Sequence, residues 1–202
     1  MINIPYQAAQ FGYANGIELC YDIFGAEDAH PMIMIMGLGA QMIEWDEEFC
    51  KELAASGIRV IRFDNRDVGQ STWMSSPYTL ADMANDVVGL MDLLNLKSAH
   101  VVGASIGSAI AQELAIVAPQ RVRSLTLTMS STGDPALPMS GEAMALVSLP
   151  PPTTREGFIS HYTQMSKRLR AGTFPEDEQR DRDRAEHVFA RGFNPTAASR
   201  QL

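Results

Sequence analysis

An unbroken apolar run, Met32-Ile33-Met34-Ile35-Met36, restricts the possible folds more than any other feature of this sequence. Such a run predicts a strand that is buried on both faces, as in a parallel sheet covered by helices. Short apolar segments and helical patterns alternate after it. Further strands are expected over 58–63, 99–102 and 122–129, and helices over 42–56, 79–94 and 105–117. This alternation predicts an α/β fold with a mainly parallel sheet.

An antiparallel hairpin is expected ahead of this alternation, over residues 9–24. Aromatic and aliphatic residues alternate with other residues from Phe11 to Tyr21, and Asn15-Gly16 lies between the two halves. Asn-Gly at such a position is a strong signal for a type I′ turn. The predicted fold class is therefore an α/β core with flanking helices, a mainly parallel sheet and an N-terminal antiparallel hairpin.

The chain changes character after Thr132. Residues 133–153 are rich in proline and glycine, and two helices are expected to follow, over about 155–171 and 176–191. The second helix carries many charges of both signs, which is typical of a helix face in contact with solvent.

Two regions follow from this change. We interpret residues 1–133 as the core and residues 134–202 as a mobile helical excursion from it. Asn194-Pro195 is a typical helix start, with asparagine as the N-cap and proline at the first helical position. Because only a few residues separate this start from Leu202, we expect the natural chain to continue beyond it.

The composition argues against several classes of protein. The 202 residues include 16 Lys and Arg and 24 Asp and Glu, so the formal net charge is −8 and offers no electrostatic footprint for nucleic acid or an anionic membrane. No apolar stretch reaches the roughly 18 residues of a membrane-spanning helix, and the N-terminus does not resemble a secretory signal. Cys20 and Cys50 lack the spacing of a zinc or dithiol site, so we expect two buried thiols in a reducing cytoplasm. No metal or organic cofactor is implied.

The strongest motif is Gly103-Ala104-Ser105-Ile106-Gly107. It follows a predicted strand and opens a predicted helix, which is the setting of a nucleophile elbow. The turn is so tight that Ser105 must take a strained backbone conformation, and side chains at 103 and 107 would collide with neighbouring backbone. The motif predicts that the Ser105 hydroxyl lies at a helix N-terminus, where free N–H groups stabilise developing negative charge. The alternative is an ordinary glycine-rich turn.

A second glycine motif, Gly37-Leu38-Gly39, follows the first buried strand. Acyl transfer needs two backbone N–H donors for the oxyanion, one from the residue after the nucleophile and one from a loop near the elbow. Ile106 fits the first role and Leu38 the second, because the glycines beside Leu38 would let a substrate carbonyl approach closely. The alternative is a turn that requires positive φ angles.

The same glycines permit a rival hypothesis. Residues 37–42 are close to the dinucleotide-binding fingerprint, and Asp64 ends the next strand, where a ribose-binding acid would lie. Met42, however, occupies the third glycine position, where close packing of helix and strand favours Gly or Ala. A dinucleotide-binding domain is therefore the lesser alternative.

A polar loop over residues 64–71 completes the set of motifs, and we expect Arg66 to form ion pairs there with Asp64 and Asp67. The hairpin, the Gly-x-Gly loop, the Asp-x-Arg-x-x-Gly-x-Ser loop and the serine elbow come in the order and spacing of the α/β-hydrolase superfamily, which the chain resembles over about residues 9–202. The polar loop is most similar to that of esterases of the aclacinomycin methylesterase type, although many relatives have glycine where Asp67 stands.

The resemblance implies that Ser105 is the nucleophile, that the N–H groups of Leu38 and Ile106 form the oxyanion hole, and that a helical lid or cap begins at about residue 134. The supporting glycines are Gly37, Gly39, Gly103 and Gly107. In this family the acid and the histidine of the triad come after the nucleophile and the lid. We therefore expect both of them beyond Leu202.

The histidines of this chain offer a weaker alternative. His30 and His100 are expected to be structural. Asp134 with His161 or His187 would keep the chain order of the triad, although a base on lid helices would have to be held within hydrogen-bond reach.

The predicted function is a serine ester hydrolase, of which this chain is an N-terminal portion whose own activity stays open. The missing strands would come from a longer gene product or from a second chain. The substrate would be a small-molecule apolar ester, with no nucleic acid or membrane partner. The apolar residues that could line its pocket are Trp73, Tyr78, Met139, Met144, Leu146 and Leu149.

A non-catalytic binding protein on the same fold is the alternative to an enzyme, because the acid and the histidine are missing. The serine at position 105 argues against a dehalogenase or an epoxide hydrolase, since these use an aspartate nucleophile.

Overall fold

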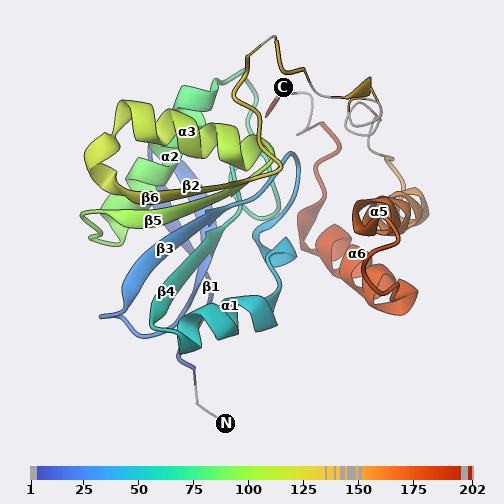
Figure 1. The fold of residues 1–202 in the computed structure, drawn as a ribbon, viewed down its shortest axis with the longest axis horizontal. Helices are drawn as coiled ribbons and strands as arrows, with labels where there is room; N and C mark the ends of the chain where they lie inside the picture. The colour runs from blue at the N-terminus through green and yellow to red at the C-terminus, as the bar shows by residue number, and fades with distance from the viewer. Residues whose placement is uncertain are drawn as a thin grey trace.

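Six strands form one sheet in the part of the chain that the computed structural model describes, residues 4–134, 136–138, 140–141, 144, 149, 152–196 and 200–201. The strands are β1 (Tyr6–Ala14), β2 (Ile17–Phe24), β3 (His30–Ile35), β4 (Ile58–Phe63), β5 (Ala99–Ala104) and β6 (Val122–Thr128). Their order across the sheet is β1-β2-β4-β3-β5-β6 (Figure 1). β2 is antiparallel to β1 and β4, whereas β3 to β6 are parallel. The predicted fold class is confirmed.

Helices lie on both faces of this sheet. They are η1 (Met42–Glu44), α1 (Glu47–Ala55), α2 (Leu80–Leu93), α3 (Ile106–Val117), η2 (Pro119–Arg121), α5 (Arg155–Arg170) and α6 (Glu178–Gly192). The main hydrophobic core lies between α2, α3 and the sheet, and a smaller cluster around Phe24 and Met34 lies under α1 (Figure 1). Helices α5 and α6 pack on each other beside the sheet, around Phe158 and Ile159. None of the described helices combines the length and the apolar character that crossing a membrane requires.

The predicted hairpin turn is confirmed, and α2 begins with a capping box. Asn15 and Gly16 have φ angles of 48° and 80°, the positive values that a type I′ turn requires. At the start of α2, the Asp82 carboxylate accepts a hydrogen bond from Thr79 N at 2.7 Å, and Thr79 Oγ1 accepts one from Asp82 N at 3.2 Å.

The two cysteines are free and buried, as the sequence predicts. Burial raises the pKa of the Cys20 thiol to about 12 and that of the Cys50 thiol to about 11. Both thiols are therefore protonated at neutral pH and poor nucleophiles.

The prediction of one helix over 42–56 is wrong, because the helix is interrupted after Glu44. η1 ends there, and α1 begins at Glu47. Asp46 lies in the gap and caps α1, since its side chain accepts a hydrogen bond from Glu48 N at 3.0 Å. The Arg62 side chain donates to Trp45 O, a carbonyl that a continuous helix would have used internally. The apolar spacing persists across the interruption, so spacing alone does not reveal it.

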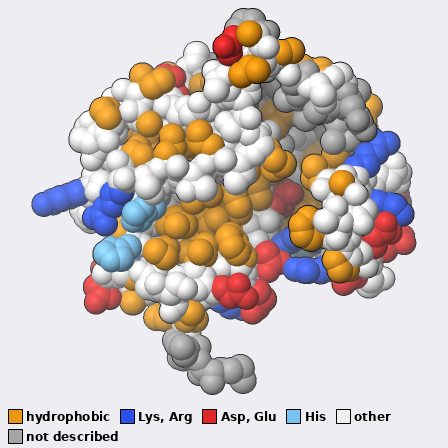
Figure 2. All heavy atoms as spheres, in the orientation of Figure 1, with side chains coloured by type: hydrophobic (Ala, Val, Ile, Leu, Met, Phe, Trp, Pro, Cys, Tyr) orange, Lys and Arg blue, Asp and Glu red, His pale blue; other side chains and the backbone are white. Residues whose placement is uncertain are grey.

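Within the described residues the sheet ends at β6, and this edge strand leaves most of its side chains exposed. Leu125 is 37% exposed, and at the end of the neighbouring α3 Ile116 is 74% exposed. Figure 2 shows hydrophobic side chains gathered over the part of the molecule where Figure 1 draws β3 to β5. A parallel sheet is normally covered on both faces, so this side of the fold is only partly covered by the described residues.

Candidate active site

Ser105 lies at the sharp turn between β5 and α3. Its φ and ψ angles are 54° and −121°, a conformation that L-residues rarely adopt. The Ser105 amide donates to Thr128 O on β6 at 2.9 Å, and its carbonyl accepts from Ser108 N at 2.8 Å. The side chain is half-buried at the first turn of α3. This is the strained geometry that the elbow motif predicts for position 105.

The glycines around Ser105 have no room for a side chain. A Cβ on Gly103 would lie 2.3 Å from Gly107 O, and a Cβ on Gly107 would lie 2.3 Å from Ile35 O and 2.7 Å from Met36 O. These neighbours are backbone atoms, so they cannot rotate away. The close approach lets α3 start directly above the end of β3.

Residues 37–41, here called the glycine loop, lie against Ser105. A Cβ on Gly37 would be 3.4 Å from Ser105 Cβ and 4.0 Å from its Oγ. Gly39 has a φ angle of 64°, which glycine adopts without strain. Within the described residues, nothing accepts a hydrogen bond from the N–H groups of Leu38 and Ile106. Two unpaired amides thus lie on the two segments that meet at Ser105.

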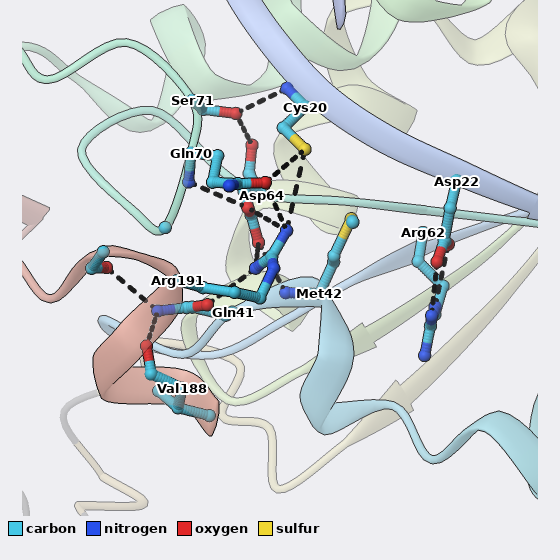
Figure 3. Close-up of polar contacts among 12 residues, drawn as sticks. Cys20, Asp22, Gln41, Met42, Arg62, Asp64, Gln70, Ser71, Val188 and Arg191 are labelled. Atoms are coloured by element: carbon cyan, nitrogen blue, oxygen red, sulfur yellow. Dashed lines mark hydrogen bonds and ion pairs between the residues drawn. The ribbon is translucent and has the colours of Figure 1, made fainter. Parts of the chain in front are cut away.

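The polar loop that follows β4 supports the glycine loop. Asp64 is fully buried, and its carboxylate accepts hydrogen bonds from Met42 N at 2.7 Å and from Gln70 N at 3.0 Å (Figure 3). A Cβ on Gly69 would lie 2.4 Å from Asp64 Oδ2, so this position also needs glycine. Arg191 of α6 completes the set with an ion pair of 3.0 Å to Asp64. The dinucleotide hypothesis requires an Asp64 carboxylate that is free to bind a ribose, and these contacts leave it unavailable.

The prediction that Arg66 pairs with Asp64 and Asp67 is wrong. Arg66 Nε and Nη2 each lie 2.6 Å from an oxygen of Asp86 on α2. Asp67 pairs instead with Arg200, with 2.7 Å between Nε and Oδ2. Asp67 has a φ angle of 69°, so the chain bends sharply and turns neighbouring charges in different directions. Although burial raises it, hydrogen bonds from Arg200 and from Met74 N hold the pKa of the Asp67 carboxyl below its ordinary value.

Asp86→Ala is expected to lower the free energy of unfolding by about 3–5 kcal/mol, because it leaves the buried Arg66 guanidinium without its partner. Urea unfolding measures this difference. The matched control is Asp92→Ala on the same helix, whose carboxylate pairs with Arg121 but is 64% exposed. That change should cost no more than about 1 kcal/mol. Equal losses in the two variants would contradict the prediction.

Several residues that hold the glycine loop were not singled out from the sequence. Gln41 is buried, and its Nε2 donates to Val188 O at 2.8 Å and to Gly192 O at 2.9 Å. Gln41 N donates to Glu44 Oε1 at 2.9 Å, and burial raises the pKa of the Glu44 carboxyl. Val188 and Gly192 follow Gln41 by 147 and 151 residues in the chain, and no local pattern signals contacts at such a separation.

The histidines do not reach Ser105 through any hydrogen bond of the described residues. His30 begins β3, and His100 lies at the start of β5, with its Nδ1 2.7 Å from Ser124 Oγ. Ser105 follows the last residue of β5, at the opposite end of that strand. His30 and His100 therefore both lie at the N-terminal ends of their strands, opposite the end where the elbow lies.

The alternative pair of Asp134 with His161 or His187 is not assembled in the described residues. Asp134 Oδ1 accepts a hydrogen bond from Ala136 N at 2.8 Å, and its side chain is exposed. His161 lies on α5 and His187 on α6, and no hydrogen bond joins either ring to Asp134 within the described part of the chain. Among these residues there is also no cluster of three or more His, Cys, Asp or Glu that could hold a metal ion.

The apolar residues proposed for a pocket are dispersed. Trp73 is half exposed, and its Nε1 donates to Gly69 O at 3.1 Å. Tyr78 packs against the main core instead, with the Arg66 guanidinium 5.0 Å from its ring centre. Met144 and Leu149 are each about half exposed. Met139 and Leu146 lie outside the described residues.

The comparisons with known proteins show the family to which the fold belongs. A family model of the alpha/beta hydrolase fold matches residues 30–189. The chain is 37% identical over 107 residues to rhodomycin D methylesterase of Streptomyces sp. (strain C5), a match that covers 52% of this chain and 36% of the relative. The methylesterase of the same name from Streptomyces peucetius is 36% identical over 107 residues, with the same coverage.

A solved structure extends the similarity over nearly the whole chain. The crystal structure of a hydrolase from Pseudomonas aeruginosa covers 96% of this chain and 72% of its own, with a TM-score of 0.66 and 28% sequence identity. The matches to the two methylesterases, in contrast, span little more than a third of the length of those relatives. Because the family model accounts for most of the sequence, the chain belongs to the α/β-hydrolase fold family, a family of enzymes.

Proposed function

We propose that the protein is a serine ester hydrolase in which Ser105 is the nucleophile. The observation that carries this proposal is the strained backbone of Ser105, with φ 54° and ψ −121°, directly beside the glycine loop. Strain of this kind persists where function requires it, since it costs about 1–3 kcal/mol. An ordinary glycine-rich turn would need neither a serine in this conformation nor a second loop beside it whose Leu38 amide has no acceptor among the described residues.

The chemistry follows from this arrangement. Ser105 Oγ attacks the ester carbonyl and passes its proton to a base, so that a tetrahedral intermediate with a negatively charged oxygen forms. The N–H groups of Leu38 and Ile106 are the two donors available to that oxygen. The intermediate expels the alcohol, which takes up the proton, and leaves an acyl-enzyme. Water then hydrolyses the acyl-enzyme and restores the Ser105 hydroxyl.

Among the described residues no histidine forms a hydrogen bond with Ser105 or with Asp134, so we propose that other parts of the whole protein supply the base and its orienting acid. These would belong to the same polypeptide or to a second chain. The edge strand β6 supports this proposal, because its outer edge pairs with no strand of the described residues and is where a further strand would bind. The thiols of Cys20 and Cys50, free and buried, fit the predicted reducing cytoplasm.

The proposed substrate is a small-molecule ester with an apolar body. The rhodomycin D methylesterases are the relatives that suggest a methyl ester. The half-exposed Trp73, next to the polar loop, supports an apolar binding surface. In this proposal residues 1–133 belong to the core, and residues 134–202 form the helical lid or cap over the substrate.

An activity-based fluorophosphonate probe tests this proposal on the whole protein. The probe should form a single adduct, and mass spectrometry should locate it on the peptide that contains Ser105. Pre-incubation with an apolar methyl ester should slow the labelling. Labelling of another residue, or none at all, would show that Ser105 is not an activated nucleophile.

A non-catalytic binding protein is the second candidate, and it is favoured because no histidine of the described residues forms a hydrogen bond with Ser105. This candidate predicts that an apolar ester binds to the whole protein without being hydrolysed and that the probe does not label it.

A further inference from the structure

We propose that Gln201 and Arg191 are positioning residues, which hold the glycine loop in place so that the Leu38 N–H is fixed beside Ser105. This inference rests on the proposed function, because it concerns the loop that supplies one of the two oxyanion donors. Its structural basis is that the C-terminal segment binds the glycine loop at two points after Leu38, the Gly39 amide and the Gln41 side chain.

Gln201 binds the residue immediately after Leu38. Its Oε1 accepts a hydrogen bond from Gly39 N at 2.8 Å, while its Nε2 donates to Arg66 O at 3.2 Å. The side chain is only 6% exposed, so both of its polar ends are used inside the protein. Gln201 thus bridges the glycine loop to the polar loop, and it fixes the orientation of the peptide group that joins Leu38 to Gly39.

Arg191 holds the other end of the glycine loop. Its Nη1 donates to Gln41 Oε1 at 2.6 Å, and its Nη2 lies 3.0 Å from Asp64 Oδ2 (Figure 3). The same Asp64 carboxylate accepts from Met42 N. In Figure 3 the Arg191 guanidinium lies between Gln41 and Asp64, so it joins the end of the loop to the carboxylate beneath it.

The ion pair between Arg191 and Asp64 is buried, unlike a pair on the protein surface. The Arg191 side chain is 10% exposed and Asp64 is not exposed at all. Arg191 Nη2 also lies 3.4 Å from Gln70 Oε1. The remaining anchor comes from the core, since Asn65 Nδ2 donates to Met36 O at 3.1 Å. The polar loop and the C-terminal segment therefore both hold the glycine loop in place.

Precise placement of an oxyanion donor matters, because deleting such a donor costs about 10²- to 10³-fold in kcat. Displacing one should cost less than deleting it. We expect Gln201→Met, which keeps the length of the side chain but forms no hydrogen bonds, to lower kcat of the whole protein about tenfold while KM stays within about twofold. Arg191→Met should have a similar effect, and the wild-type enzyme and each variant are assayed with the same methyl ester.

Matched controls separate positioning from general destabilisation. Gln179→Met changes an exposed glutamine of α6, and Arg184→Met breaks an ion pair between α6 and Asp46 that does not touch the glycine loop. Both controls should retain kcat within about twofold. A fall in kcat that is equal in the controls, or a change confined to KM, would overturn the proposal.

Hydrogen exchange provides a readout that does not depend on catalysis. The Gly39 amide should exchange about tenfold faster or more in Gln201→Met than in the wild type, because its acceptor is gone. Amides of the buried strand β3 report on global stability and should exchange at the wild-type rate. Unchanged exchange at Gly39 would overturn the positioning role even if the probe labels Ser105. Conversely, faster exchange at Gly39 in a protein that the probe does not label would support Gln201 as the holder of the loop and reject the proposed function.

Discussion

Ser105→Ala is expected to lower kcat for an apolar methyl ester by about four to six orders of magnitude in the whole protein. The change removes the oxygen that forms the acyl-enzyme, and only the stabilisation by the oxyanion donors and by substrate binding remains. KM should change little, because the hydroxyl is a single small group of the binding surface. Steady-state kinetics measure both constants, and a stopped-flow burst of released alcohol should disappear in the variant.

Two further variants make this result specific. Ser124→Ala removes a hydroxyl that binds His100 at the opposite end of the sheet, and it should keep kcat within about twofold. Ser105→Gly should be as inactive as Ser105→Ala but more stable than that variant by about 1 kcal/mol or more, because glycine adopts the φ angle of 54° without strain. A Ser105→Ala enzyme that retains more than about a hundredth of the wild-type kcat would rule out Ser105 as the nucleophile.

The features that could be predicted from the sequence depend on residues close together in the chain. The Asn15-Gly16 turn follows from the conformational freedom of two neighbours, and the bend at Ser105 follows from glycines two positions away on either side. The buried strand β3 follows from a continuous run of apolar residues. In each case local sterics or local burial decide the structure, so a short window of sequence contains the information.

The features that could not be predicted depend on pairing between distant charges. The sequence places Arg66 between two aspartates, and the prediction paired them because they are neighbours. In the fold Arg66 pairs with Asp86 of α2 instead, whereas Asp64 and Asp67 pair with Arg191 and Arg200 of the C-terminal segment. The sequence predicts a mobile helical excursion over residues 134–202, and it gives no sign of the buried ion pair between Arg191 and Asp64. The sequence alone allows a given aspartate to pair with any of these arginines, and only the tertiary structure decides which arginine lies close enough to it.

Gly107→Ala is expected to destabilise the protein by about 3 kcal/mol or more, or to prevent it from folding. At an exposed helical position the same change would stabilise by up to about 1 kcal/mol, because alanine is the better helix former. Here the added methyl group would lie 2.3 Å from Ile35 O and 2.7 Å from Met36 O, and both are backbone atoms of the central strand and the residue after it. Steric overlap therefore outweighs helix propensity, and urea unfolding measures the net effect.

The contrast with a second helix start decides whether this reasoning is right. A Cβ on Gly157, in the first turn of α5, would lie 2.9 Å from Thr154 Oγ1 and 3.0 Å from Pro152 Cβ, and both are side-chain atoms. Because Thr154 Oγ1 caps α5 by accepting from Gly157 N, turning the hydroxyl away loses one capping bond, and Gly157→Ala should cost no more than about 1–2 kcal/mol. If the two variants were equally stable, the close approach of α3 to β3 would not be what requires glycine at position 107. If Gly107→Ala alone is destabilised, the surviving folded fraction should also lose activity, because α3 can relieve the overlap only by moving the Ile106 amide away from the glycine loop.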